Sequence, residues 1–159
     1  PVLAASPAQA GTNATSDAGA RLAARGLSLV EGEEVMRLFQ SPARLEERVV
    51  FIDARKEERY QAGHIPGAHH FDHYYAQRHL EEVLPVCQLA EVVVVYCGGG
   101  SCEDSEFAAM LLRDAGIPGD RLRVYLGGME DWTRRGMPVE KGERGAAGDA
   151  ASAVTEGTP

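Results

Sequence analysis

Two runs of mostly β-branched residues constrain the fold more than any other feature of the chain. They are VVFIDA at residues 49–54 and EVVVVYC at residues 91–97. Neither run alternates apolar with polar residues, as a strand with one face in water would. Continuous apolar runs of this length are typical of strands that are buried on both faces of a parallel sheet. Helices must therefore cover both faces of that sheet.

The segments around these runs alternate between strand-like and helix-like patterns. Further short strands are predicted at residues 27–30, 68–71 and 121–128. Helices are predicted at residues 31–40, 56–63, 72–85, 103–116 and 129–136, with Asp72 as an N-cap and Pro85 at the end of the third. Strands that alternate with helices predict an α/β domain with a mainly parallel sheet of about five strands.

The length of 159 residues allows one domain with a real core and hardly two. Residues 1–21 and 142–159 are small and polar, with almost nothing to bury. We expect the first to be a flexible arm or linker and the second a disordered tail. The folded domain is therefore predicted at residues 22–141.

Charge and composition exclude several classes of partner. The net charge of −8 argues against nucleic-acid binding, which needs a basic face. No apolar stretch reaches the roughly 18 residues of a membrane helix, so we expect no membrane contact by this domain. Three cysteines do not make a disulfide scaffold, which favours a reducing, cytoplasmic compartment. Because the chain begins with Pro1, we expect a longer precursor, and tethering through an upstream segment stays open.

The segment YCGGGSCEDS, residues 96–105, has the clearest chemistry. Cys97 and Cys102 enclose three glycines directly after the second buried run. Such a loop suits a redox dithiol, a metal clip, a phosphate cradle or a nucleophile. A phosphate-binding loop needs Lys-Ser or Lys-Thr after its last glycine, and this chain has Ser-Cys. A metal site formed by the two cysteines would lack a clear third ligand. The spacing of the nearby histidines favours packing or surface roles, so no metal is predicted. These histidines are His69, His70, His73 and His79.

The glycines favour a site for negative charge. Gly98, Gly99 and Gly100 have no Cβ, so the backbone can curl and turn several N–H groups inward. Ser101 is predicted to be the N-cap of the next helix, with Asp104 completing a capping box. Amides from a glycine loop and a helix N-terminus together attract an anion, such as a thiolate or persulfide at Cys97.

Four segments together resemble the single-domain rhodanese family of sulfurtransferases. They are FIDARKEERYQAGHIPGA at residues 51–68, VVVYC at 93–97, the six-residue loop from Cys97 to Cys102, and LGGMEDWTRRGMPV at 126–139. The resemblance implies a three-layer fold with helices on both faces of the sheet, and no cofactor. Within it His64 is expected to stabilise a turn, Cys87 to be a small buried residue, and Trp132 to lie in the core.

The resemblance also implies a reaction. Cys97 would take a sulfane sulfur from a small-molecule or protein donor and hold it as a persulfide. It would then pass the sulfur to a thiol or to cyanide. The amides of residues 98–102 would stabilise the anionic intermediate. Asp53 and Arg55 would support the rim of the site as an ion pair.

The loop departs from the family pattern at its sixth position. Many active members carry an arginine or lysine there, whereas this chain has Cys102 followed by Glu103 and Asp104. The nearest downstream cation is Arg113, about three helical turns away. We therefore expect thiosulfate to be a poor donor. Related phosphatases and arsenate reductases use a loop one residue longer that ends in arginine, so their chemistry is not expected.

Cys102 leaves three classes of function open. It either fills a corner of the loop or attacks the Cys97 persulfide as a resolving thiol, releasing sulfide and leaving a disulfide. A sulfurtransferase that uses Cys97 is the favoured interpretation. The alternatives are a Cys97/Cys102 dithiol oxidoreductase or redox sensor, and a non-catalytic module that binds a partner or regulates an attached domain.

Overall fold

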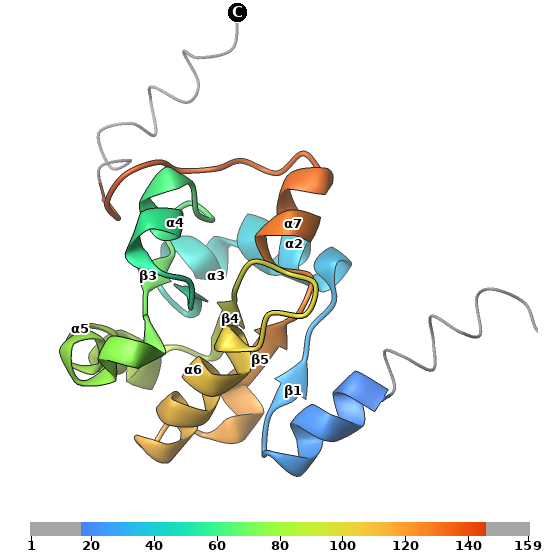
Figure 1. Ribbon diagram of the computed structural model, residues 1–159, viewed down its shortest axis with the longest axis vertical. Coiled ribbons are helices and arrows are strands. Elements are labelled where there is room, and N and C mark those ends of the chain that lie inside the picture. The colour runs from blue at the N-terminus through green and yellow to red at the C-terminus, as the bar shows by residue number, and fades with distance from the viewer. Residues whose placement is uncertain (1–16, 146–159) are drawn as a thin grey trace, which may run out of the picture.

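A computed structural model of the chain describes residues 17–145 and contains a five-stranded sheet (Figure 1). Its strands are β1 (Ser28–Leu29), β2 (Val49–Asp53), β3 (His69–His70), β4 (Val92–Tyr96) and β5 (Leu122–Tyr125). Their order is β1-β5-β4-β2-β3, and every neighbouring pair is parallel. The two β-branched runs thus lie side by side at the centre, which confirms the predicted α/β class.

Helices cover both faces of the sheet. They are α2 (Gly32–Gln40), α3 (Pro42–Leu45), α4 (Glu57–Ala62), α5 (Ala76–Leu89), α6 (Asp104–Asp114) and α7 (Gly128–Arg134). The 3-10 turns η1 (His73–Tyr75) and η2 (Gly119–Arg121) and a helix at residues 17–24 complete the elements. In Figure 1, α2, α3 and α7 lie on one side of the sheet, and α5 and α6 lie on the other.

Alternate residues of the central strands enter two separate cores. Val94 and Tyr96 of β4 pack with residues of α2 and α7. Val93 and Val95 pack with residues of α5 and α6, and Cys97 continues this second set. Successive strand residues point to opposite faces, which is why both sets are apolar. The candidate nucleophile therefore lies on the α5–α6 side of the sheet.

The folded region extends beyond both predicted boundaries. The helix at residues 17–24 includes residues 17–21, which were assigned to the flexible arm, and Leu22 is fully buried. At the other end, the Gly142 amide donates to the carbonyl oxygen of Gln61 and Arg144 donates to that of Gly67. The remainder of the predicted arm and tail, residues 1–16 and 146–159, lies outside the described residues.

The region around α5 differs from the predicted helix at residues 72–85. Asp72 caps η1 instead, where its side chain accepts from the Tyr74 amide. The helix proper begins at Ala76 and continues through Pro85 to Leu89. Val83 and Cys87, on either side of the exposed Pro85, are both buried. Their burial holds the helix together across a residue that lacks an amide proton.

Over residues 17–145, none of the helices is both long and apolar enough to cross a membrane.

Replacement of Trp132 should test the core beneath α7. Trp132 is fully buried, its ring lies 5.0 Å from that of Phe39, and its indole N–H donates to the carbonyl oxygen of Pro138. We expect Trp132→Ala to lower the free energy of unfolding by about 3–5 kcal/mol in chemical denaturation. Leu89→Ala, at an exposed position, is the control and should change it by less than about 0.5 kcal/mol. Equal effects of the two substitutions would contradict this account of the core.

Candidate functional site

The loop after β4 is held against the first turn of α7. The carbonyl oxygen of Cys97 accepts from the Met129 amide at 2.9 Å, and that of Gly98 accepts from the Glu130 amide at 3.0 Å. Figure 1 shows this loop passing between α7 and α6 at the carboxyl end of β4. In a parallel sheet this is the edge at which ligands gather.

Two glycines allow the loop to curl. Gly99 and Gly100 have φ values of 108° and 62°, in the left-handed region that favours glycine. A Cβ on Gly99 would lie 2.5 Å from the carbonyl oxygen of Gly127. A larger residue at position 99 would therefore separate the loop from α7.

The predicted cap of α6 is wrong. The helix begins at Asp104 with Glu103 in the N-cap position, and no side chain makes a capping hydrogen bond there. Ser101 is exposed and lies in the turn that precedes the helix. The carbonyl oxygen of Gly99 accepts from the Cys102 amide at 3.3 Å, so a tight backbone turn takes up the residues that a capping box would have used.

The sulfur of Cys97 is almost fully covered. The residue is 1% exposed, and Sγ lies 3.4 Å from Ser105 Oγ and 3.5 Å from the carbonyl oxygen of Cys102. The Ser105 hydroxyl can donate to an anionic sulfur, whereas the carbonyl only accepts. Ser105 lies in the first turn of α6, where the helix dipole also favours negative charge. Sequence reasoning missed Ser105, whose one signal was its place near the start of that helix.

The second cysteine lies beside the first, with both thiols free. Burial and then a side-chain hydrogen bond with Cys97 raise the pKa of Cys102 to about 11. Hydrogen bonds from the amides of Gly98 and Asp104 act in the opposite direction. These two amides therefore serve the Cys102 sulfur, whereas the sequence analysis expected the loop amides to serve Cys97.

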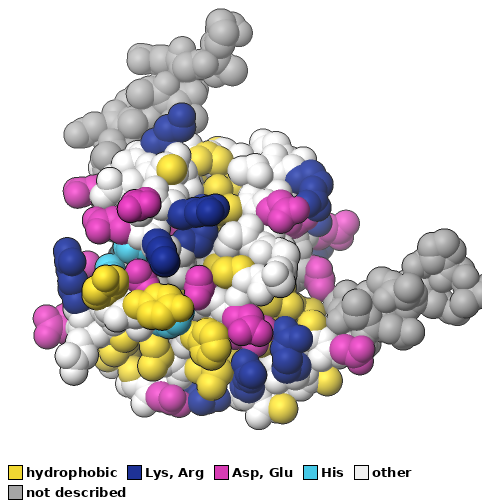
Figure 2. Space-filling model, viewed as in Figure 1, with side chains coloured by type: hydrophobic (Ala, Val, Ile, Leu, Met, Phe, Trp, Pro, Cys, Tyr) yellow, Lys and Arg dark blue, Asp and Glu magenta, His cyan; other side chains and the backbone are white. Residues whose placement is uncertain are grey.

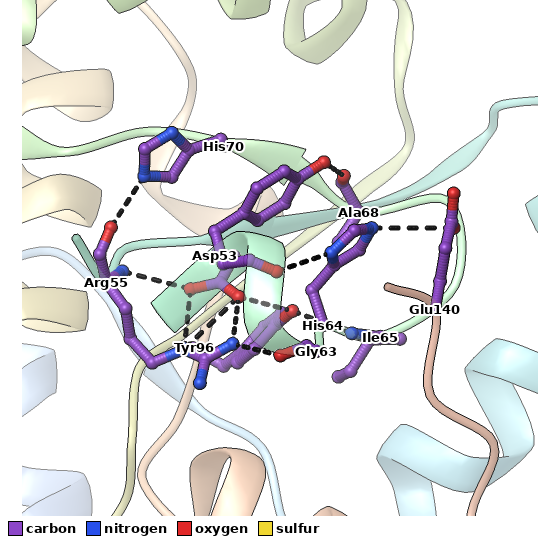
Figure 3. Close-up of polar contacts among 10 residues, drawn as sticks. Asp53, Arg55, Gly63, His64, Ile65, Ala68, His70, Tyr96 and Glu140 are labelled. Carbon is purple, nitrogen blue, oxygen red and sulfur yellow. Dashed lines mark hydrogen bonds and ion pairs between the residues drawn. The ribbon is translucent and has the colours of Figure 1, made fainter. Parts of the chain in front are cut away.

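Asp53 and Arg55 form a buried ion pair at the end of β2 (Figure 3). Arg55 Nη2 lies 2.7 Å from Asp53 Oδ2, and the Asp53 side chain has no exposed surface. Arg55 also donates to the carbonyl oxygen of Gly63, and its own amide donates to Asp53. The predicted pairing of these two residues is confirmed.

The same carboxylate reaches β4. The Tyr96 hydroxyl donates to Asp53 Oδ2 at 2.9 Å and accepts from the Ile65 amide at 2.9 Å. Burial lowers the pKa of Arg55, but the hydrogen bond and charge of Asp53 outweigh it, so the net shift is upward. Tyr96 and then Cys97 add smaller upward contributions to the pKa of Arg55.

The histidines of this region serve packing. The His64 ring stacks on Tyr60 with centroids 3.9 Å apart, and Nδ1 lies 2.8 Å from the Tyr60 carbonyl oxygen, as a turn-stabilising residue should. His70 stacks against Tyr60, and His79 meets His70 edge-on. Residues 17–145 contain no group of three or more histidine, cysteine or acidic side chains arranged to hold a metal ion.

A hollow of about 520 Å³ opens beside the loop, with cations on its wall. Arg55 and Arg59 line it on one side, and Gly98 and Glu130 line it on the other. Arg59 comes from α4, far from the loop in sequence, and was not identified in the sequence analysis. Arg113, the nearest cation along the chain, instead contacts the carbonyl oxygen of Arg25. The loop itself has no arginine or lysine, so the cationic side chains of this hollow come from the end of β2 and from α4.

A larger hollow of about 840 Å³ lies between α4 and the η1–α5 segment and includes no residue of the loop. Its lining mixes both charges with exposed tyrosines, and Figure 2 shows basic, acidic and hydrophobic side chains interspersed across this face of the molecule. Gly98, which follows the candidate nucleophile, lines the smaller hollow, whereas no loop residue lines the larger one, so the smaller hollow is the candidate site.

The family follows from these features together with a direct match. Residues 34–135 match the model of the rhodanese-like domain family. The chain belongs to that family. Its match spans β2, β4, the cysteine loop and α7, which are the elements that build the site.

The proteins whose sequence or structure is similar to this chain are named for different activities. An HTH-type transcriptional regulator of Mycobacterium tuberculosis is 34% identical over 64% of this chain, which spans 42% of that relative's length. Arsenate reductase 2.2 of rice (Oryza sativa subsp. japonica) is 26% identical over 73% of this chain and 89% of its own. A thiosulfate sulfurtransferase structure from Pseudomonas aeruginosa superimposes with a TM-score of 0.52 at 28% identity, covering 77% of this chain and 22% of that one. The family supports sulfur transfer or a related activity.

Removal of the Ser105 hydroxyl should slow the chemistry of Cys97. A hydrogen bond to an ionised group contributes about 1.5–3 kcal/mol, which corresponds to at least about a tenfold change in a rate that depends on it. We expect Ser105→Ala to lower the rate of iodoacetamide alkylation of Cys97 at neutral pH by about tenfold. Peptide-level mass spectrometry measures that rate. The exposed Ser101→Ala is the matched control and should leave it unchanged, and an unchanged rate in Ser105→Ala would refute the contact's role.

Proposed function

We propose that this chain is a sulfurtransferase that carries a sulfane sulfur as a persulfide on Cys97. The observation that carries the proposal is the position of that cysteine, at the end of the central strand and 3.4 Å from the Ser105 hydroxyl. The next residue, Gly98, lines a hollow together with Arg55 and Arg59. A thiolate in that position has a hydrogen-bond donor, and the adjoining hollow carries positive charge.

The reaction runs in two displacements. The Cys97 thiolate attacks the sulfane sulfur of the donor, a new Sγ–S bond forms, and the rest of the donor leaves with the electron pair of the broken bond. A thiolate or cyanide then attacks the outer sulfur, and Cys97 departs as the thiolate. Each step replaces one bond to the transferred sulfur with another, so no external oxidant or cofactor is needed.

The hollow favours an anionic donor. Arg59 is exposed on the wall, which Arg55 also lines. Glu103 and Asp104 follow the loop and oppose a compact divalent anion such as thiosulfate. A persulfide of a small thiol, whose reacting sulfur end carries a single charge, suits the site better. Because Cys97 is only 1% exposed, transfer also requires the loop to shift, which the glycines at positions 99 and 100 allow.

A turnover assay tests the proposal. We expect the wild type to transfer sulfur from glutathione persulfide to cyanide or a thiol, and to do so less readily from thiosulfate. Cys97→Ser should abolish transfer. Arg59→Ala should raise the KM for the persulfide about tenfold, while Arg37→Ala, which removes an exposed arginine paired only within α2, should not. Absence of turnover by the wild type with every donor would overturn the proposal.

A Cys97/Cys102 redox pair is the second candidate. Two free thiols in one loop favour it, with Cys97 Sγ 3.5 Å from the carbonyl oxygen of Cys102, and so does the similarity to a transcriptional regulator, a protein class other than enzymes. A reversible disulfide that forms under oxidant, in a protein inactive with every sulfur donor, would favour this candidate over the first.

A further inference from the structure

The second cysteine of the loop has a carboxylate beside it. Cys102 Sγ lies 3.6 Å from Oδ2 of Asp104, the first residue of α6. The thiol is the donor in this contact, because a carboxylate only accepts. The other carboxylate oxygen of Asp104, Oδ1, lies 2.8 Å from Nε2 of His73. A single carboxylate thus joins a thiol to an imidazole.

His73 is fixed against α6 by its ring. The ring lies 5.4 Å from that of Phe107, in α6, and 4.2 Å from that of Tyr74, measured between centroids. The His73 side chain is 15% exposed and that of Asp104 is 34% exposed. The hydrogen bond therefore joins η1 to the start of α6 in a partly buried setting, and it determines which way the carboxylate faces.

The protonation state of Cys102 matters because of what lies beside it. The side chains of Cys97 and Cys102 are within hydrogen-bonding reach of each other. A Cys102 thiolate would be a nucleophile next to the sulfur of Cys97. A carboxylate at 3.6 Å disfavours that thiolate, both by repulsion between like charges and by accepting the hydrogen bond of the thiol.

When Cys97 carries a persulfide, Cys102 can react with it in one way. The Cys102 sulfur attacks Sγ of Cys97, a Cys97–Cys102 disulfide forms, and the outer sulfur leaves with the electron pair of the broken bond. The proton of Cys102 ends on the departing sulfur, so a persulfide anion and a thiol give a disulfide and HS⁻. The sulfane sulfur gains two electrons, and a thiol reductant from solution restores the two cysteines.

We propose that Asp104, oriented by His73, adds to burial in keeping Cys102 a protonated thiol and thereby slows this discharge, so that the sulfur stays on Cys97 until an acceptor arrives. Asp104 and His73 are positioning residues, since they act through Cys102. The inference rests on the proposed function for the identity of the protected sulfur. Among the described residues, the titratable side chains that contact Cys102, Asp104 or His73 include Cys97 at the end of β4 and Tyr74 in η1.

The first experiment measures the thiol directly and requires no sulfur transfer. In a Cys97→Ser background, the rate of iodoacetamide alkylation of Cys102 is followed against pH by peptide-level mass spectrometry. We expect Asp104→Asn to shift the profile downward by about one pH unit, which is about a tenfold faster reaction at neutral pH. A purely structural role for Asp104 would not produce this shift. An unchanged or upward-shifted profile would overturn the proposal.

His73 variants supply the matched control and a second route. His73→Gln retains a donor toward Asp104 and should keep the original profile. His73→Ala frees the carboxylate to rotate away from Cys102 and should shift the profile in the same direction as Asp104→Asn, by a smaller amount. Should Asp104→Asn fail to fold, His73→Gln and His73→Ala are compared instead. Equal pH profiles of Cys102 alkylation in these two variants would then refute the role of Asp104.

The second experiment measures the lifetime of the persulfide. Protein with Cys97 intact is loaded with glutathione persulfide, and the extra sulfur is followed by mass spectrometry. We expect Asp104→Asn to lose it several-fold faster than the wild type, and the double variant Asp104→Asn, Cys102→Ser to retain it. Equal lifetimes in all three would overturn the protective role. A wild type that never loads would sink the proposed function, while the alkylation profile would still decide the role of Asp104.

Discussion

The arrangement of the site depends on one buried charge, the carboxylate of Asp53. It accepts from Arg55 and from the Tyr96 hydroxyl, and its residue has no exposed surface. Arg55 in turn binds the carbonyl oxygen of Gly63, and Tyr96 binds the Ile65 amide. Removal of one partner of a buried pair typically costs about 3–5 kcal/mol, because the other charge is left without compensation. The ends of β2, α4 and β4 are thus held in register by one residue.

The Tyr96 side chain, which binds Asp53, and the Cys97 side chain lie on opposite faces of the sheet. Tyr96 points into the core beneath α2 and α7, while the next residue, Cys97, points toward α5 and α6. The alternation of a strand separates the two with no intervening residue. The buried polar network can therefore remain constant while the loop beside Cys97 changes its chemistry, which suits a family whose relatives include an arsenate reductase and a sulfurtransferase.

The sequence was most informative where packing alone decides the outcome. The β-branched runs predicted β2 and β4 correctly, because only a strand buried on both faces uses such residues throughout. The Asp53–Arg55 pair was predictable because the two residues are neighbours in the chain. Arg59 and the His73–Asp104 contact were not predicted, since each brings together elements that are distant in sequence. Ser105 is only eight residues from Cys97 and was missed because the sequence does not show how the loop curls between them. The cap at Ser101 failed because the tight turn at Gly99 consumes the residues that would have formed it, and Pro85 failed to end α5 because the flanking residues are buried.

The hydrogen bonds between α7 and the cysteine loop affect the order in which the site forms during folding. Two amides of α7 bind the carbonyl oxygens of Cys97 and Gly98, and α7 is the last helix of the domain. During synthesis, β4 and its cysteine emerge well before residues 128–134. The loop therefore acquires its closed form only once nearly all of the domain has left the ribosome. Until α7 has formed, Cys97 therefore lies in a loop that has not yet closed, and among the elements of residues 17–145 the last helix is the one that completes the site.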